Sequence, residues 1–367
     1  MEPALSLSMI VRNEESVLGN VLGDVVDLCD ELVVVDTGSV DRTVEIAQSF
    51  GARVMHFDWI DDFAAARNYA LDLCSGPWIL WLDADDRVPA EAQAGFRSII
   101  EELPRLDDID ILFLPYRYKF SATAPSCCIS TLSRGRLFRN RPDLRWIGKI
   151  HEYVQAEGKR AASRTDAWVE HRPPIGHEKN SERRNLQVLE RCIAEGDRSN
   201  RTMSYYAWTL ASLDRHEEAL DTFEALLSEP LEPDPDSRYG RYQMLCTAAA
   251  SAAALGIEDQ KLELLSRATV LDSERGEAFA ELGKHFYEKR EWRRAIPFFT
   301  AVTSLREPEY GQFNPMWYAW LPWDFLAVCE SEIGDFEKAL DFTLRALPGA
   351  PDRDRLIANI RLYAEHL

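Results

Sequence analysis

Several features that would assign a protein to a membrane, a disulfide framework or a zinc site are missing from this 367-residue sequence. Its seven cysteines are an odd number with no Cys-x-x-Cys pair, which predicts reduced thiols in a cytoplasmic compartment. No apolar run approaches the roughly 18 residues that a membrane span requires. The first residues also lack the basic segment of a signal peptide. We therefore expect a cytoplasmic protein without a membrane span.

Positive charge is scarce as well. The chain has 42 Lys and Arg against 62 Asp and Glu, a formal net charge of −20. Such a charge repels nucleic-acid phosphates and anionic lipids, so we expect no nucleic-acid partner. The hydrophobic content of 46% is enough for large buried cores, and the length predicts two or three domains.

The first half of the chain alternates short apolar runs with amphipathic segments. This alternation predicts a mostly parallel sheet with right-handed crossovers. The expected strands are residues 5–11, 31–35, 53–57, 77–82, 109–118 and 168–170, and the expected helices are residues 17–26, 44–50, 64–73 and 89–103.

Three acids stand where the most apolar strand ends. The run at residues 77–82 stops on Asp83, Asp85 and Asp86. Ligands of open α/β sheets bind outside the carboxyl ends of the strands. Asp83 and Asp85 can therefore share a divalent cation with diphosphate oxygens. The structural alternative is an acidic turn that only ends a strand, because Asp-x-Asp triplets are common.

Polar residues also follow the neighbouring elements. Asp36 ends the second strand, and Gly38 permits a positive φ or a close backbone approach. The alternative for Asp36 is a cap on the next helix. Arg67 lies near the start of the helix before the three acids; its alternative role is an ion pair with Asp61 or Asp62 on a surface helix.

Four segments resemble, in the same order, the signature of family-two glycosyltransferases, which have the GT-A fold. They are residues 8–15 (SMIVRNEE), 35–43 (VDTGSVDRT), 58–59 with 63–68 (DW and FAAARN), and 82–86 (LDADD). The resemblance implies an α/β, Rossmann-like, mostly parallel GT-A domain over residues 1–190. It also implies an inverting, metal-dependent hexosyltransferase that takes a sugar from a nucleotide-sugar, by default a UDP-sugar.

The same resemblance implies roles for individual residues. The loop after the first strand, together with Asp36, would hold the nucleotide base. Asp83 would lie by the ribose and the metal, and Arg67 would face the diphosphate. The residues implied at the nucleotide-sugar are Val11, Arg12, Asn13, Glu14, Asp36, Gly38, Arg67, Asp83 and Ala84.

A base and a third metal ligand complete the implied site. Residues 148–152 match the Gly-x-x-His-Glu element of related enzymes, which makes Glu152 the implied base for the acceptor proton. The implied ligands of Mn²⁺ or Mg²⁺ are Asp83, Asp85 and His171. The turn after His171 departs from the family's His-x-Gly-Tyr pattern, so His151 and His177 stay alternatives at the metal.

A basic segment interrupts this acidic protein. It consists of Arg134, Arg136, Arg139, Arg141, Arg145 and Lys149. The contrast with the rest of the chain predicts an anionic partner. A nucleotide diphosphate, an acceptor phosphate and the acids of the second half all satisfy this requirement.

In the second half of the chain, from about residue 180, the sequence pattern predicts only helices, arranged in pairs that are joined by short turns. Residues 276–308 resemble the tetratricopeptide repeat, with Leu282-Gly283 in the first helix and Phe299 in the second. Since such repeats stack on their neighbours, we expect an all-α tetratricopeptide-like array over residues 191–367. Arrays of this kind bind peptides and proteins, so a protein partner or a homodimer through this domain is expected.

An insertion at residues 306–322 breaks the repeat and is dense in aromatic residues, Trp317 among them. It lines an acceptor groove or a dimer face, or else its rings plug the junction between two helix pairs.

Two other function classes stay open. The chain can be a tetratricopeptide scaffold whose nucleotide-sugar-binding domain is degenerate. A nucleotidyltransferase would share the sheet and the metal, but the Gly-rich phosphate loop it normally carries after the first strand is missing. The sugar and the acceptor, whether glycan, peptide, protein or modified DNA, are not determined by these residues.

Overall fold

The computed structural model describes residues 4–155, 158–174, 177–231 and 235–367, without the side chains of residues 177–180 and 235–236. The chain divides into two compact units. The first consists of residues 1–118 and 132–192, and the second of residues 119–131 and 193–367. Each unit is described by itself.

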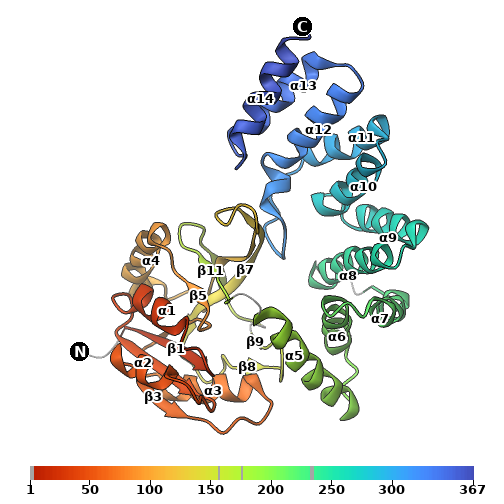
Figure 1. The fold of residues 1–367 in the computed structure, drawn as a ribbon. Coiled ribbons are helices and arrows are strands. Elements are labelled where there is room, and N and C mark those ends of the chain that lie inside the picture. Colours follow the sequence, from red (N-terminus) through yellow and green to blue (C-terminus); the bar gives the residue numbers. More distant parts are fainter. Residues whose placement is uncertain (1–3, 156–157, 175–176, 232–234) are drawn as a thin grey trace. The chain divides into compact units, whose positions relative to one another are not determined.

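The first unit is built on a mixed sheet. Among the described residues its order is β3-β2-β1-β4-β7-β6-β11-β5, with β10 beside β6 (Figure 1). The strands are β1 (Leu5–Val11), β2 (Glu31–Asp36), β3 (Arg53–His56), β4 (Trp78–Trp81), β5 (Asp86–Arg87), β6 (Ile111–Phe120), β7 (Cys128–Arg139), β10 (Ala161–Ser163) and β11 (Val169–His171).

The strand order reverses at β1. This strand is parallel to β2 on one side and to β4 on the other, although β4 follows much later in the chain. The loops that leave β1 and β4 therefore emerge side by side at the carboxyl edge of the sheet. In open α/β sheets such a switch point is where ligands bind.

Helices cover both faces of this sheet because its strands are apolar on both sides. On one face Leu7 and Met9 pack against α1 (Leu18–Val25), and α4 (Ala90–Glu102) joins the same core. On the other face Ile79 and Trp81 pack against α3 (Phe63–Leu73). The remaining crossover helix is α2 (Thr43–Ser49).

The six expected strands and four expected helices all appear, and the strands lie within two residues of their expected bounds. The long strand β7 was missed, because its alternating arginines read as a charged segment. The pair β8 (Trp146–Ile147) and β9 (Tyr153–Val154) and the short strands β5 and β10 were missed as well. Strands of two or three residues have no sequence period of their own and exist only through their partners.

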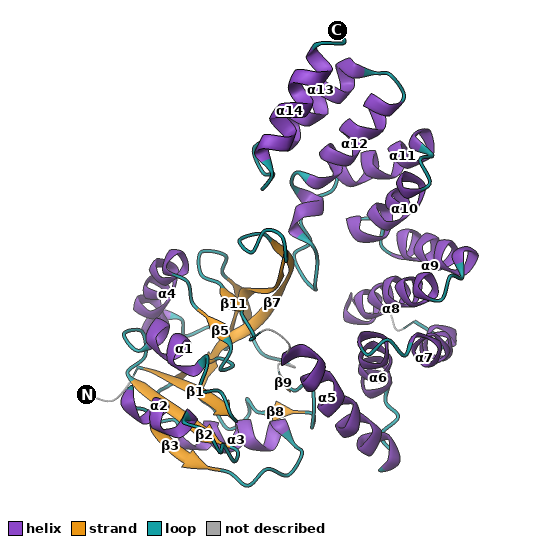
Figure 2. Cartoon of the chain, viewed as in Figure 1, coloured by secondary structure: helices purple, strands orange, loops and turns teal. Residues whose placement is uncertain are grey.

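From α5 onward the described chain is helical (Figure 2). The helices are α5 (His177–Ala194), α6 (Asn200–Ser212), α7 (His216–Ser228), α8 (Pro235–Ala254), α9 (Glu258–Leu271), α10 (Gly276–Glu288), α11 (Trp292–Thr303), α12 (Leu321–Glu332), α13 (Phe336–Ala346) and α14 (Arg353–Ala364). In the described residues no helix is long and apolar enough to cross a membrane.

The helices of the second unit pack as the repeat pattern predicts. A Cβ atom on Gly283 of α10 would lie 2.8 Å from the Phe299 ring of α11, so only glycine permits this close approach. Ala280, Ala295 and Phe299 are buried in the shared core. The tetratricopeptide-like array is confirmed as the fold of this part of the chain.

The rings of the 306–322 insertion are buried to different degrees: Trp317 is buried, Tyr318 and Trp320 are partly buried, and Tyr310 is exposed. Trp317, in the 3-10 helix η2 (Pro315–Tyr318), is buried and stacks on Phe299 and Phe325. The Phe313 backbone exchanges two hydrogen bonds of 2.9 Å with Thr131, which also belongs to the second unit. These rings plug the junction between helices, which was the structural alternative.

Candidate functional site

The three acids after β4 form a closed turn. The Asp86 backbone N–H donates to the Asp83 carbonyl over 3.1 Å, and the Asp86 carboxylate accepts the Asp83 backbone N–H over 2.9 Å. Asp86 is fully buried, where Arg136 and the Tyr116 hydroxyl each lie 2.9 Å from its oxygens. The turn is thus anchored from inside the fold, and it holds Asp83 and Asp85 beside the carboxyl end of β1.

Asp85, Asp86 and His171 form a candidate metal centre. Each offers one ligand atom, and these atoms lie within 4.8 Å of one another. His171 joins the group because β11 is antiparallel to β5 and places it opposite Asp86. Its Nδ1 is 3.5 Å from Asp85 Oδ1 and 3.7 Å from Asp86 Oδ1. One imidazole with two carboxylates is a donor set suited to a divalent cation such as Mn²⁺.

The His171 ring supports this assignment. Nδ1 is buried and has no hydrogen-bond acceptor among the described residues, although a buried polar atom normally has one. The ring stacks on Tyr118 with centroids 5.1 Å apart and planes 7° apart, which fixes its orientation. Burial opposes the charged imidazole, but the Asp85 and Asp86 carboxylates outweigh it and raise the His171 pKa to about 10.

Asp83 has a different partner. Its Oδ1 accepts a hydrogen bond of 2.6 Å from Arg67 Nη2. Burial alone would raise the Asp83 pKa, but Arg67, Arg136 and Arg134 together hold it well below its usual range. The structure thus gathers Asp86, and not Asp83, with Asp85 and His171. The sequence analysis passed over Asp86, although its place in the run of acids was the available signal.

Arg67 joins two acids of the site. Its Nε donates to Glu152 Oε1 over 2.6 Å while its Nη2 holds Asp83. Its guanidinium is buried against a T-shaped pair of indole rings, 4.8 Å from the centroid of Trp81 and 4.9 Å from that of Trp146. The expectation that Arg67 faces a diphosphate is not tested by these contacts.

The alternative for Arg67, an ion pair on a surface helix, is wrong. Asp62 instead caps α3 by accepting the Ala65 backbone N–H over 2.9 Å. Asp61 pairs with Arg191 of α5. The pairing of Arg67 with Asp83 and Glu152 joins residues 16 and 85 positions apart in the chain, so local spacing does not reveal it.

The loop that carries Glu152 is tied to the start of α3. The Lys149 carbonyl accepts the Phe63 backbone N–H over 2.9 Å. Gly148 and His151 have φ angles of 95° and 51°, which turn the chain sharply before Glu152. Among the described residues His151 is not part of the cluster around Asp85. The His177 side chain lies outside the described part of the chain.

The loops after β1 and β2 are joined to each other. Asn13, with a φ of 56°, donates its backbone N–H to Ser39 Oγ over 2.9 Å and accepts the Val40 backbone N–H on Oδ1 over 2.8 Å. Both the Thr37 N–H and its hydroxyl donate to the Val11 carbonyl, at 2.9 and 3.1 Å. The loop that begins with the exposed Arg12 therefore has a defined shape.

Asp36 organises the second of these loops. Its carboxylate accepts the backbone N–H groups of Gly38 and Ser39 at 3.1 to 3.2 Å. Gly38 has a φ of 104°, which favours glycine at this position. His56 also lies beside this carboxylate, with Nδ1 3.6 Å from Asp36 Oδ2. Asp36 shapes this turn and does not cap α2, whose N-cap is Arg42.

Glu14 extends the acidic crevice. Burial raises its pKa to about 7, and the negative charges of Asp85 and Asp83 add to the effect. Ala84, between these two acids, is buried. The loops after β1 and β4 thus bring Glu14, Asp83 and Asp85 to one place, as the switch-point topology requires.

The basic segment divides into two groups. Arg139 donates to the Leu106 and Ile109 carbonyls, Arg141 pairs with Asp110 and Asp143, and Arg145 pairs with Asp72. These partners belong to the first unit, so the second half is not the source of their anions. Arg134 and Arg136 instead stack on Trp81 and Tyr116 next to Asp83.

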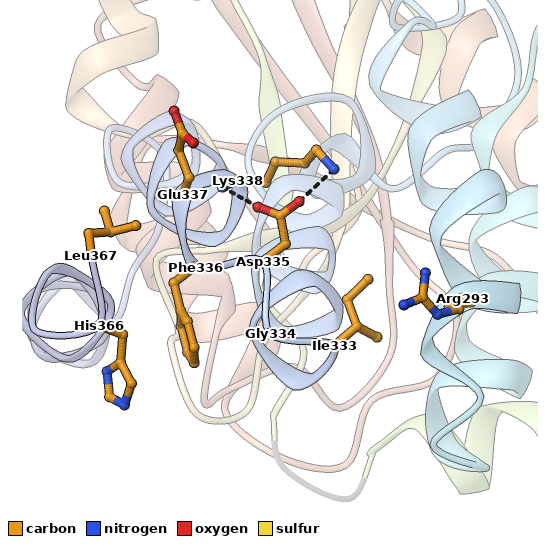
Figure 3. A pocket seen from close by; sticks show the side chains of 9 residues that line it. All are labelled: Arg293, Ile333, Gly334, Asp335, Phe336, Glu337, Lys338, His366 and Leu367. Carbon is orange, nitrogen blue, oxygen red and sulfur yellow. Dashed lines mark hydrogen bonds and ion pairs between the residues drawn. The ribbon is translucent and has the colours of Figure 1, made fainter.

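A cavity of about 460 Å³ lies in the second unit, away from these residues in the chain. Its lining includes Arg293, Phe336 and His366 (Figure 3). Asp335 lies at its centre and pairs with Lys338 over 2.7 Å. Charges of both signs line it, so it has no clear preference for an anion or a cation.

Comparison with known proteins identifies the first part of the chain. The family model described as glycosyl transferase family 2 matches residues 6–110, which contain β1 to β4 and the turn of three acids. Residues 6–110 are a family-two glycosyltransferase domain. The sequence resemblance is therefore confirmed for this part of the chain.

Curated relatives agree with this assignment. The chain is 30% identical over 190 residues to the lipopolysaccharide core biosynthesis glycosyltransferase LpsC of Rhizobium meliloti, covering 48% of this chain and 66% of that protein. It is 25% identical over 226 residues to the SPbeta prophage-derived glycosyltransferase SunS of Bacillus subtilis, covering 60% and 52%. A TPR repeat-containing protein of Synechococcus elongatus is 45% identical over 150 residues, covering 41% and 35%.

The chain thus spans about a third to two thirds of the length of these relatives. A solved structure, the C-terminal part of a TPR repeat-containing protein from Cytophaga hutchinsonii, matches 52% of this chain and 74% of its own with 14% identity and a TM-score of 0.40.

Proposed function

We propose that this chain is an inverting, metal-dependent glycosyltransferase that moves a sugar from a nucleotide-sugar, by default a UDP-sugar, to a hydroxyl or thiol acceptor. The observation that carries the proposal is the candidate metal centre of Asp85, Asp86 and His171 at the switch point of a family-two domain. The donor set and the His171 nitrogen without an acceptor support Mn²⁺ or Mg²⁺ as the cation.

A divalent cation bound there would take up negative charge on the departing diphosphate. Asp85, Asp86 and His171 would hold it, and Asp83, the ligand implied by the sequence resemblance, would lie on the same turn beside them. The linked loops of Asn13, Asp36 and Gly38 would hold the nucleotide, and they have the defined shape that a binding site needs.

Glu152 would act as the base. The acceptor oxygen forms a bond to the anomeric carbon, the bond from that carbon to the diphosphate breaks, and Glu152 accepts the acceptor proton. Its carboxylate is largely buried and is oriented by Arg67 over 2.6 Å. Orientation of this kind lowers the entropic cost of bringing base and acceptor together.

The test is turnover by the full chain. Purified protein with Mn²⁺ is assayed against a panel of UDP- and GDP-sugars, and release of the free nucleotide is measured. We expect slow hydrolysis or transfer with one donor, lost in Asp85→Asn and retained in Asp58→Asn, a matched change at an acid that is 97% exposed. No turnover with any donor and no nucleotide binding by calorimetry would overturn the proposal.

The identity of the acceptor belongs to the same proposal. The named relatives act, by their printed descriptions, in lipopolysaccharide core biosynthesis or carry only the name glycosyltransferase. We propose a glycan, a peptide or a protein as acceptor, with the tetratricopeptide-like array as the surface that binds a protein partner.

A further inference from the structure

One arginine beside the proposed site makes no close ion pair, although its charge helps to lower the pKa of Asp83. Arg134 lies on β7, half-buried, and its guanidinium is 5.3 Å from the Trp81 ring centroid and 5.5 Å from that of Tyr116. It makes no hydrogen bond and no ion pair with any residue that the structure describes. In a chain with a net charge of −20, a half-buried cation left unpaired is unusual.

The register of the sheet places Arg134 beside the acids. β7 is antiparallel to β4, with Leu80 opposite Leu137 and Ile79 opposite Phe138. Arg134 lies three residues before Leu137 on β7, and its charge acts on Asp83, which follows the end of β4. The Trp81 indole N–H donates to the Gly135 carbonyl over 2.6 Å, and this hydrogen bond joins strands β4 and β7 at the end of β4.

The neighbouring arginines are already paired, and Arg134 is the exception. Three guanidinium groups surround the Trp81 ring, those of Arg67, Arg134 and Arg136, the last 4.0 Å from its centroid. Arg67 holds Asp83 and Glu152, and Arg136 holds Asp86. The ring faces attract all three cations, but they do not satisfy the N–H donors of Arg134.

We propose that Arg134 is an anion-binding residue that recognises a phosphate-type oxyanion of a substrate. A guanidinium stays charged at all relevant pH values and matches the oxygens of a phosphate through two parallel hydrogen bonds. The oxyanion has two sources, the diphosphate of the nucleotide-sugar and a phosphate group on the acceptor. This inference rests on the proposed function for the source of the oxyanion, but not for the anion binding itself.

The experiment is calorimetry on the full chain with Mn²⁺. The probes are UDP, uridine, and inorganic phosphate titrated into the UDP-saturated protein. The variants are Arg134→Gln and Arg134→Lys, with Arg105→Ala as the charge control, because Arg105 is an exposed arginine on the turn after α4.

We expect Arg134→Gln to raise the Kd of one anionic probe about tenfold, which corresponds to about 1.4 kcal/mol, and to leave uridine binding unchanged. An effect on UDP identifies the donor diphosphate, and an effect only on phosphate identifies the acceptor. Arg134→Lys should recover part of the affinity, since lysine keeps the positive charge but cannot form the two parallel hydrogen bonds of a guanidinium. Anion affinities within twofold of wild type in both Arg134 variants would overturn the proposal.

Failure of the proposed function gives a different result. If no nucleotide binds to the wild-type chain, the same variants are compared with inorganic pyrophosphate as the probe. Weaker pyrophosphate binding in Arg134→Gln than in Arg105→Ala supports the anion site without a nucleotide-sugar. Equal binding in the two variants, or none in the wild-type chain, overturns it. Thermal melting of each variant confirms that the comparison is between folded proteins.

Discussion

Arg67 Nε donates a hydrogen bond of 2.6 Å to Glu152 Oε1, so the predicted base is joined to a buried cation that also holds Asp83. The guanidinium is buried and packs against the Trp81 and Trp146 rings, which restricts its movement. The pair links the acceptor side of the proposed reaction to the donor side.

Replacement of Arg67 should damage both the fold and the reaction. Arg67→Met leaves Asp83 and Glu152 without their buried partner, which typically costs about 3–5 kcal/mol. Arg67→Lys keeps a charge but cannot bond both acids in the same plane, so we expect a smaller loss. Thermal melting measures the difference, and a melting temperature of Arg67→Met equal to that of wild type would contradict the bridging role.

Glu152→Gln should separate catalysis from binding. The amide keeps the size of the side chain but cannot take the acceptor proton, so we expect turnover to fall by about 10²–10⁴-fold. The Kd for UDP with Mn²⁺ should stay within about twofold of wild type, because the amide oxygen can still accept the hydrogen bond from Arg67 Nε. Turnover at the wild-type rate would assign the base to another residue.

Metal removal should abolish turnover and allow its recovery. We expect EDTA to stop nucleotide release and added Mn²⁺ or Mg²⁺ to restore it. Asp85→Asn and His171→Gln should each weaken Mn²⁺ binding, measured by calorimetry, by about tenfold or more, since each removes one ligand of the candidate centre. Full activity in EDTA-treated protein would exclude a required metal, whatever the affinities of the variants.

Glu14 should make the stability depend on pH. Burial and the charges of Asp85 and Asp83 raise its pKa to about 7, so the folded state disfavours the ionised carboxylate. Its contribution to stability is complete below the unfolded pKa near 4.5 and is lost as the pH rises through about 7. Glu14→Gln should therefore raise the melting temperature at pH 8 more than at pH 5.5. An equal shift at both pH values would contradict the raised pKa.

Close packing makes Gly95 of α4 irreplaceable. A Cβ atom there would lie 1.9 Å from the Asp166 carbonyl oxygen. Relief of this clash requires a movement of the backbone, which costs more free energy than a side-chain rotation. We expect Gly95→Ala to lower the melting temperature clearly. The matched control is Gly23→Ala in α1, where the nearest atom is 3.8 Å away and the gain in helix propensity should stabilise by up to about 1 kcal/mol. Equal melting temperatures for the two variants would contradict this packing.

The elements of the fold were largely readable from the sequence. Strands such as β2 and β4 are apolar on both faces, and α3 follows a clear helical period, so local residue patterns determine them. Strand β7 could not be predicted from the sequence, because Arg134 and Arg136 interrupt its apolar pattern. These arginines fit into the sheet because their guanidinium groups pack against the Trp81 and Tyr116 rings, which the local sequence does not show.

By itself the sequence determined the alternating strands and helices, the paired helices of the array and the acids that end β4, because these depend on neighbours a few residues away. Tertiary structure alone decided which acids meet. Asp86 joins Asp85 and His171 through the pairing of β5 with β11, and Arg67 reaches Glu152 across 85 positions of chain. These side chains meet because segments that are distant in the chain pack together. Burial and electrostatic attraction then pair the charged groups, and the local sequence pattern gives no sign of this pairing.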